Sequence, residues 1–198
     1  MFRMKALPVL LCAGLLAACS SSDNSGKRGS AAHRPIAVQP PPKAGSQIVN
    51  GDFERTAADG IIPGWDQLQH AGPKSYNMRI DPEGAFQGHG SFHMTRTQEQ
   101  VYGSLVQNLD LKAYGGKTVE LSAMVKTRDV GPKGWMLYLS ANLPGKAQFS
   151  QPVTGTTDWQ QQSVKLTLPT DAHHVTAGVF LKDAGDGWMD NVELKVVD

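Results

Sequence analysis

The chain has 198 residues and a formal net charge of +1; 40% of its residues are apolar and 19% are charged. This composition is typical of a soluble globular protein with one or two domains, and the nearly neutral balance argues against a nucleic-acid-binding protein, which needs a basic face. Two cysteines, Cys12 and Cys19, are too few for a disulfide scaffold.

Residues 1–18 have the pattern of an export signal. Arg3 and Lys5 precede an apolar run over residues 6–18. A short basic region followed by about 7 to 15 apolar residues is typical of a secretory signal, whereas a membrane-spanning helix needs about 20. We therefore expect the chain to be exported.

The end of this run, Leu16-Ala17-Ala18-Cys19, resembles the lipobox of bacterial lipoproteins. The resemblance implies that Cys19 carries a palmitate-type acyl anchor and becomes the first residue of the mature chain, and Ser20 after it implies the outer membrane. The alternative is a plain signal peptide cut near Ala18, which would leave Cys19 as a free thiol. An exposed thiol is a liability in an oxidising compartment, which favours lipidation.

Residues 19–46 are rich in Ser, Pro and Gly, and Ile36 and Val38 are their only large aliphatic residues. Such a segment cannot bury enough apolar area to offset the entropy of ordering its backbone. It is therefore predicted to be a flexible tether, spanning about 30 Å as a random coil. Its basic residues could contact anionic lipid, but a solvated linker is the favoured interpretation.

Residues 47–198 alternate apolar and polar residues with a period of two, the pattern of half-buried strands. The clearest predicted strands are 119–126, 136–141, 163–168 and 174–182; weaker ones are 48–54, 74–80, 91–97, 102–111, 147–153 and 188–197. Turn signals separate them at Gly115-Gly116, Gly131-Pro132, Pro144-Gly145 and Gly185-Asp186-Gly187. No segment sustains a helical period, so the sequence predicts an all-β antiparallel sandwich, most simply a jelly roll.

Four motifs occur in a characteristic order along this domain. They are Asn50-Gly51-Asp52-Phe53-Glu54, Pro63-Gly64-Trp65, the run from Gly116 to Lys126, and the run from Met189 to Leu194. Together they resemble the galactose-binding-like jelly rolls of carbohydrate-binding modules of family 4/9 type. Val119 and Asn191 depart from that pattern, in which Tyr and Asp are usual. The resemblance implies the jelly-roll fold, and its functional implication is glycan binding.

Asp190 has the same parity as Val192 and Leu194, so its carboxylate is expected to face the interior, where it needs a cation or several hydrogen-bond donors. In the resembled modules the matching carboxylates hold a structural Ca²⁺ with backbone carbonyls from a loop. The resemblance therefore implies a calcium site made by Glu54 and Asp190, with a loop that includes Gly88 and His89. In the alternative interpretation, Asp190 caps a turn or pairs with a lysine.

The sequence gives no sign of catalysis. It contains no nucleophile elbow, phosphate-binding loop or dinucleotide motif. His89 and His93 fall in a loop and a strand, which disfavours a zinc pair. A hydrolase would need two carboxylates facing each other across a cleft, which no spacing indicates. We therefore expect a non-enzymatic protein.

A sugar site needs an aromatic platform, because a pyranose offers an apolar C–H face. Tyr138 and Phe180 occupy positions of the predicted strands that face outward, and Tyr102 and Gln148 lie on neighbouring predicted strands, so we predict these four as ligand-binding residues. The four tryptophans are expected to be packing residues. We predict a lipid-anchored envelope protein that binds a glycan, and the alternative is a structural or protein-interaction lipoprotein. Residues 47–198 contain 13 basic and 17 acidic residues, a net −4 that favours a neutral glycan or a protein partner over a polyanion unless Ca²⁺ offsets it.

Overall fold

The computed structural model describes residues 45–57, 59–141 and 147–198. They belong to the second of two compact units, residues 37–198. The predicted signal, the lipidation site at Cys19, most of the predicted tether and the Pro144-Gly145 turn lie outside the described residues. Within the described part of the chain, no helix is long and apolar enough to cross a membrane.

The described residues form nine antiparallel strands and one short 3-10 turn, Lys112–Tyr114. The strands are β1 (Asp66–Gln69), β2 (Tyr76–Asp81), β3 (Ser91–Arg96), β4 (Gly103–Asp110), β5 (Thr118–Ala141), β6 (Ala147–Phe149), β7 (Val153–Thr167), β8 (His174–Leu181) and β9 (Asp186–Val196). This result confirms the predicted all-β antiparallel sandwich.

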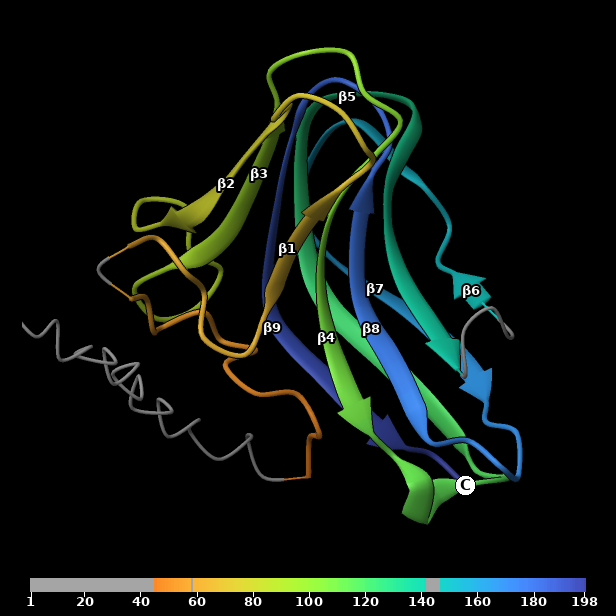
Figure 1. Ribbon diagram of the computed structural model, residues 1–198. Coiled ribbons are helices and arrows are strands. Elements are labelled where there is room, and N and C mark those ends of the chain that lie inside the picture. Colours follow the sequence, from red (N-terminus) through yellow and green to blue (C-terminus); the bar gives the residue numbers. More distant parts are fainter. Residues whose placement is uncertain (1–44, 58, 142–146) are drawn as a thin grey trace, which may run out of the picture. The chain divides into compact units, whose positions relative to one another are not determined.

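The strands form two layers that share β5 (Figure 1). One layer has the order β1-β4-β8 and continues through the second half of β5 to β6. The other has the order β2-β3-β9 and continues through the first half of β5 to β7. We call them the β8 layer and the β9 layer.

β5 crosses from the β9 layer to the β8 layer (Figure 1). Its pairing with β9 ends at Arg128, and its pairing with β8 begins at Trp135. Left-handed backbone at Asp129 (φ 53) and Gly134 (φ 75) accompanies the register shifts between these points. The Gly131-Pro132 signal therefore marks an irregular bend inside one long strand, where the prediction placed a turn between two strands.

Aromatic rings fill the core between the layers. Phe53 is fully buried and lies 5.5 Å from Trp65 and 5.9 Å from Phe92 between ring centres. Phe92 is in turn 6.2 Å from Trp135. These contacts join the opening segment to β3 and β5, so the segment before β1 is fixed by packing although it forms no strand.

Several strand predictions need correction. Residues 48–54 form no strand, because two left-handed residues within them, Asn50 and Phe53, break the extended backbone that a strand needs. The predictions missed β1, whose residues are mostly exposed, and the first half of β7, where polar residues predominate. Both segments pair through their backbones with better-patterned strands, and a pattern of side-chain hydrophobicity does not record such pairing.

Candidate functional site

Four aromatic side chains meet on the outer face of the β8 layer. We call Tyr102, Tyr138, Phe149 and Phe180 the aromatic cluster. Phe180 is at its centre, with ring centres 5.1 Å from Tyr102, 4.9 Å from Tyr138 and 5.9 Å from Phe149. Tyr138 and Phe149 are 5.1 Å apart. Most of these pairs are edge-on, the geometry that the ring quadrupoles favour.

Strand register brings these rings together. Tyr138 of β5 lies directly opposite Phe149 of β6, and Met136, two residues earlier in β5, lies opposite Phe180 of β8. The neighbouring core-facing residues Leu137, Val179 and Leu181 are fully buried. Since alternate residues of a strand face opposite sides, the aromatic side chains point away from the core.

The structure therefore brings together three of the four residues predicted to bind ligand: Tyr102, Tyr138 and Phe180. Gln148 is the exception. It lies opposite Leu139, which is fully buried and faces the core, so Gln148 does not share a face with the cluster. Phe149 takes that place and was missed, although alternation from Gln148 could have pointed to it.

The cluster is accessible from outside the domain. Phe149 is 40% exposed. Leu68 of β1 lies opposite Ser104 of β4, which in turn lies opposite Phe180 of β8, and Leu68 is 49% exposed. Tyr102 and Phe180 are half-buried, whereas Tyr138 is covered by its aromatic neighbours. The outer face thus offers ring surface to a flat apolar partner, and the phenolic hydroxyls of the two tyrosines can form hydrogen bonds with polar groups.

A second candidate site is a pocket of ≈ 280 Å³ between the opening segment, the loop after β2 and β9. Its walls include the predicted metal residues Glu54, Asp190 and Gly88, and also Asp52, Gln87 and Asn191, which sequence reasoning missed. We call it the acidic pocket. The loop predicted to face the two carboxylates does so, but its hydrogen bonds to them come mainly from backbone N–H groups.

Both carboxylates hold this loop in place. One Asp190 oxygen, Oδ2, accepts hydrogen bonds from the backbone N–H groups of Phe86 and Gln87, both at 3.0 Å. Glu54 Oε1 accepts from the N–H groups of His89 (2.7 Å) and Gly90 (3.3 Å), and Oε2 is 3.1 Å from the His89 ring nitrogen Nδ1. The side chain of His89 is 96% exposed, so it lies outside the pocket.

The backbone around the acidic pocket is strained. Asn50, Phe53 and Asn191 all have φ near +50, a region that non-glycine residues seldom adopt. Gly88 also has a positive φ, and a Cβ atom there would lie 2.2 Å from Glu54 Oε1. Strained residues gather at ligand-binding sites more often than elsewhere.

The burial predicted for Asp190 is confirmed, since it is only 1% exposed, but the predicted orientation is wrong. Asp190 follows Met189, which is fully buried opposite Val125, so alternation puts Asp190 on the outer face with Trp188. The left-handed Asn191 and a register shift in the pairing of β9 with β5 then reverse the parity, which returns Val192 to the core. The loop at residues 86–87 covers the carboxylate.

The electrostatics of the two carboxyls differ. Burial raises the pKa of the Asp190 carboxyl above its ordinary value, although hydrogen bonds from Gln87, Asn191 and Phe86 oppose the shift, and the nearby Glu54 charge adds to it. The backbone hydrogen bond from His89 is the main cause of a lowered pKa at Glu54. Asp190 is thus a buried acid that a bound cation would favour in its ionised form.

The residues of the acidic pocket fit a hard cation in type. Carboxylate oxygens of Asp52, Glu54 and Asp190 and amide oxygens of Gln87 and Asn191 are the ligands that Ca²⁺ prefers. Among the residues that the structure describes, no three His, Cys, Asp or Glu side chains are grouped closely enough to hold a metal by themselves. An ion here would need backbone or water oxygens as well.

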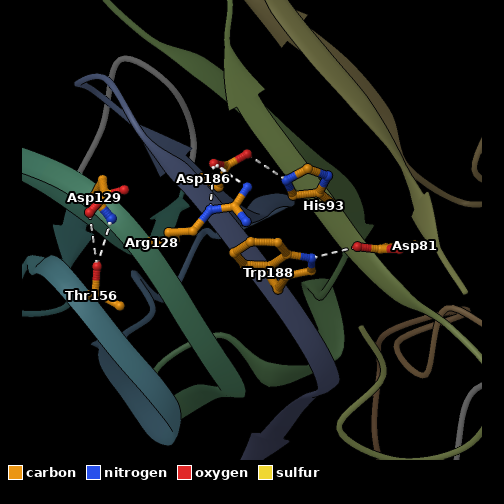
Figure 2. A network of polar contacts seen from close by, with 7 residues as sticks. All are labelled: Asp81, His93, Arg128, Asp129, Thr156, Asp186 and Trp188. Carbon is orange, nitrogen blue, oxygen red and sulfur yellow. Dashed lines mark hydrogen bonds and ion pairs between the residues drawn. The ribbon is translucent and has the colours of Figure 1, made fainter. Parts of the chain in front are cut away.

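The outer face of the β9 layer carries a polar network centred on Trp188 (Figure 2). Trp188 Nε1 donates to Asp81 Oδ2 at 2.8 Å, and His93 Nε2 is 2.9 Å from Asp186 Oδ1. Arg128 donates to Asp186 Oδ2 through Nη2 at 2.9 Å and Nε at 3.2 Å. Trp188 is therefore held in place by polar contacts on this face and does not belong to the hydrophobic core between the layers.

The two aromatic surfaces differ in what they offer a ligand. On the β9 layer, His93 stacks on Trp188, and the cationic groups of Lys126 and Arg128 lie 5.5 and 5.4 Å from its ring. Trp188 is 7% exposed, so its neighbours cover most of the ring surface that a ligand could contact. The aromatic cluster on the β8 layer therefore presents more free ring surface.

A curated protein is similar to this chain in sequence. No family model matches the chain. It is 32% identical over 153 residues to the uncharacterized HTH-type transcriptional regulator YbfP of Bacillus subtilis (strain 168), with 73% of this chain and 52% of that protein covered. The chain thus spans about half the length of this curated relative.

Among solved structures, the chain is similar to a family 16 carbohydrate-binding module, with a TM-score of 0.55, 22% identity, and 77% of this chain and 99% of that chain covered. A structure described as CBM4 has a TM-score of 0.54 and 22% identity, with 76% of this chain and 99% of that chain covered. The enzymatically active domain of tailspike protein 4 of bacteriophage CBA120 has a TM-score of 0.59 and 14% identity, with 77% of this chain and 22% of that chain covered. The domain therefore has the jelly-roll fold of carbohydrate-binding modules, which confirms the resemblance found in the sequence at the level of fold.

Proposed function

We propose that residues 47–198 form a non-catalytic glycan-binding domain whose site is the aromatic cluster. The observation that carries this proposal is the meeting of four aromatic rings, three of them accessible, on the outer face of one layer. Proteins that expose clustered apolar side chains commonly use them to bind a partner. The jelly-roll fold is compatible with this function, but a fold hosts many functions, so the site carries the argument.

A pyranose matches this surface physically. Its axial C–H groups form an apolar face that packs on an aromatic ring, while its hydroxyl groups need hydrogen bonds at the rim. Phe180 and Phe149 supply ring surface, and the hydroxyls of Tyr102 and Tyr138 supply polar groups next to them. The edge-on arrangement makes the surface faceted, so successive sugar units would contact different rings.

We also propose that Ca²⁺ binds in the acidic pocket and stabilises the domain. Glu54 and Asp190 would supply carboxylate oxygens, and Asp52, Gln87 and Asn191 would supply further oxygens. When bound, the ion would compensate two nearby negative charges, one of them buried. The chain's own contribution is to hold the loop at residues 86–90 against both carboxylates.

An acyl anchor at Cys19 would attach the domain to the outer membrane through the segment 19–46. The support for this proposal is the lipobox-like Leu16-Ala17-Ala18-Cys19 and the composition of the following segment. The glycan could then belong to the envelope or to a polymer outside the cell.

Affinity electrophoresis against a set of neutral and acidic polysaccharides tests the glycan proposal. We expect at least one polymer to retard the domain, and Phe180→Ala to weaken that binding about tenfold or more, since Phe180 contacts all three other rings. Trp159→Ala is the matched control, because Trp159 is a half-buried aromatic residue of β7, where it contacts Phe86 and not the aromatic cluster. Thermal unfolding of both variants checks that each still folds.

The proposal fails if no polysaccharide retards the domain, or if Phe180→Ala binds as well as the unmodified protein. A protein-interaction role is the second candidate, and the exposed apolar residues Leu68 and Val101 near the cluster favour it. Loss of a co-purifying envelope protein on Phe180→Ala, without any polysaccharide binding, would support that second function.

A further inference from the structure

The aromatic cluster continues into a basic pocket of ≈ 560 Å³. Tyr102 belongs to both, since its ring contacts Phe180 and also lines this pocket. Lys182 likewise lines the pocket and contacts the cluster. A saccharide that lies on the aromatic rings would therefore extend directly to the charged groups of the pocket.

Lys182 holds its charge above the rings. Its ammonium nitrogen Nζ is 4.5 Å from the ring centre of Phe149 and 5.9 Å from that of Phe180. A hydrogen bond of 3.2 Å from its backbone N–H to the carbonyl oxygen of Gly134 fixes this part of the chain. Among the described residues, no carboxylate forms an ion pair with Lys182. The electron-rich ring faces attract its charge only weakly, which leaves it available to an anion.

The other charges of the pocket are also predominantly positive. Arg96 already pairs with Asp183 at 3.4 Å, so its charge serves the fold. Lys133 is exposed and, in the described part of the chain, forms no ion pair through its side chain. Glu99 is the acidic residue of the lining. The lining of the pocket thus contains three cationic side chains and one carboxylate, on a domain whose net charge is negative.

We infer that the glycan bound by the aromatic cluster contains hexuronic acid units. This inference rests on the proposed glycan-binding function and specifies its ligand. A hexuronate has a carboxylate directly attached to the sugar ring, so the apolar C–H face and the negative charge are only a few bonds apart. The rings and the ammonium group of Lys182 are separated by a similarly short distance. The net negative charge of the domain favours a neutral glycan. The positive charges beside the aromatic cluster instead predict a preference for an acidic glycan.

Matched pairs of polysaccharides test this inference. Short oligosaccharides of polygalacturonate, alginate and glucuronan are each compared with their methyl esters by isothermal titration calorimetry, at a fixed Ca²⁺ concentration. Esterification removes the charge and keeps the sugar. We expect at least one oligouronate to bind about tenfold more tightly than its own ester, with an affinity that falls as salt screens the lysines.

Lysine variants locate the effect. We expect Lys182→Met to reduce affinity for the acid form about tenfold and to leave affinity for the ester nearly unchanged, since methionine keeps an apolar side chain over Phe149. Lys126→Met is the control, because Lys126 also lies over an aromatic ring, 5.5 Å from Trp188, but on the outer face of the β9 layer. It should bind like the unmodified protein.

Three results would overturn the inference. Equal binding of acids and esters would reject an acidic ligand but leave glycan binding itself intact. Preference for acids that survives Lys182→Met and disappears in Lys126→Met would place the anion site on the other layer. Absence of binding to every oligosaccharide, neutral glycans included, would reject both this inference and the proposed function.

Discussion

Trp188 stacks on His93 on the outer face of the β9 layer, with ring centres 4.5 Å apart and planes 12° from parallel. Asp186 and Asp81 lie on either side of the pair, and the guanidinium group of Arg128 is close by (Figure 2). The charge of Arg79, which pairs with Asp81, also acts on His93. Nδ1 of His93 is buried and, within the described residues, has no hydrogen-bond partner. This face therefore contains a histidine whose neutral form suits its surroundings.

This arrangement predicts a loss of stability in mild acid. Burial lowers the pKa of His93 from the ordinary value of 6.5, against the opposing effect of the hydrogen bond that the Asp186 carboxylate accepts from Nε2. Between the lowered pKa and about 6.5 the unfolded chain binds more protons than the folded one, so the free energy of unfolding rises with pH. The contribution of His93 to the free energy of unfolding should therefore have its full value above about pH 7 and decrease as the pH falls below about 6.5.

Urea unfolding at several pH values measures this effect. His93→Gln should flatten the dependence between pH 5 and 7, roughly the range in which histidines titrate. His70→Gln, which changes an exposed histidine next to Tyr102, should leave the dependence as it is. If both variants keep the slope of the unmodified protein, His93 is not its cause.

The calcium proposal predicts a metal-dependent melting temperature. At about a hundredfold excess over the dissociation constant, a ligand that binds only the folded state adds about 2.7 kcal/mol, which corresponds to roughly 5–10 °C for a domain of this size. We expect added Ca²⁺ to raise the melting temperature and EDTA to lower it. Asp190→Asn and Glu54→Gln should each abolish most of the response, whereas Asp66→Asn, an exposed acid on β1, should retain it. A melting curve insensitive to both Ca²⁺ and EDTA would argue against the site.

Gly88 offers a separate test of the acidic pocket. An alanine there would carry the cost of a left-handed backbone, about 1–2 kcal/mol, and its Cβ would also approach Glu54 Oε1 to 2.2 Å. Gly60 has the same φ of +78, but a Cβ added there would have no atom within 4 Å, so Gly60→Ala reports the backbone cost alone. We expect Gly88→Ala to unfold more easily than Gly60→Ala and to lose the response to Ca²⁺. Equal effects of the two substitutions would show that the contact with Glu54 is unimportant.

Lipidation at Cys19 is tested in a Gram-negative bacterial host. Radioactive palmitate should label the unmodified protein and not Cys19→Ser, since serine has no thiol to acylate. Membrane fractionation should place the labelled protein with the outer membrane, as Ser20 implies. A protein that is exported but unlabelled would indicate a plain signal peptide.

Much of this protein could be predicted from its sequence, because the relevant physics is local. Alternation of apolar and polar residues in strands such as His174–Leu181 states which side chains face the core, and this parity correctly placed Phe180 and Tyr138 on the outer face. The ordered motifs from Asn50 to Leu194 indicated a jelly roll, which the structure and its neighbours confirm. The same local rule failed at Asp190, because the left-handed Asn191 interrupts the alternation.

Only the tertiary structure decided which of the outward residues meet. Strand order and register place Phe149 and not Gln148 beside Tyr138, and they bring Lys182 over the same rings. Chain folding also closes the loop at residues 86–90 over Glu54 and Asp190, which are 136 positions apart in the sequence. Net charge is a sum over residues and can be read from a sequence, but the local charge at a site depends on distances between side chains. Those distances are set by packing, and for that reason an acidic domain can carry a pocket lined mainly by basic side chains.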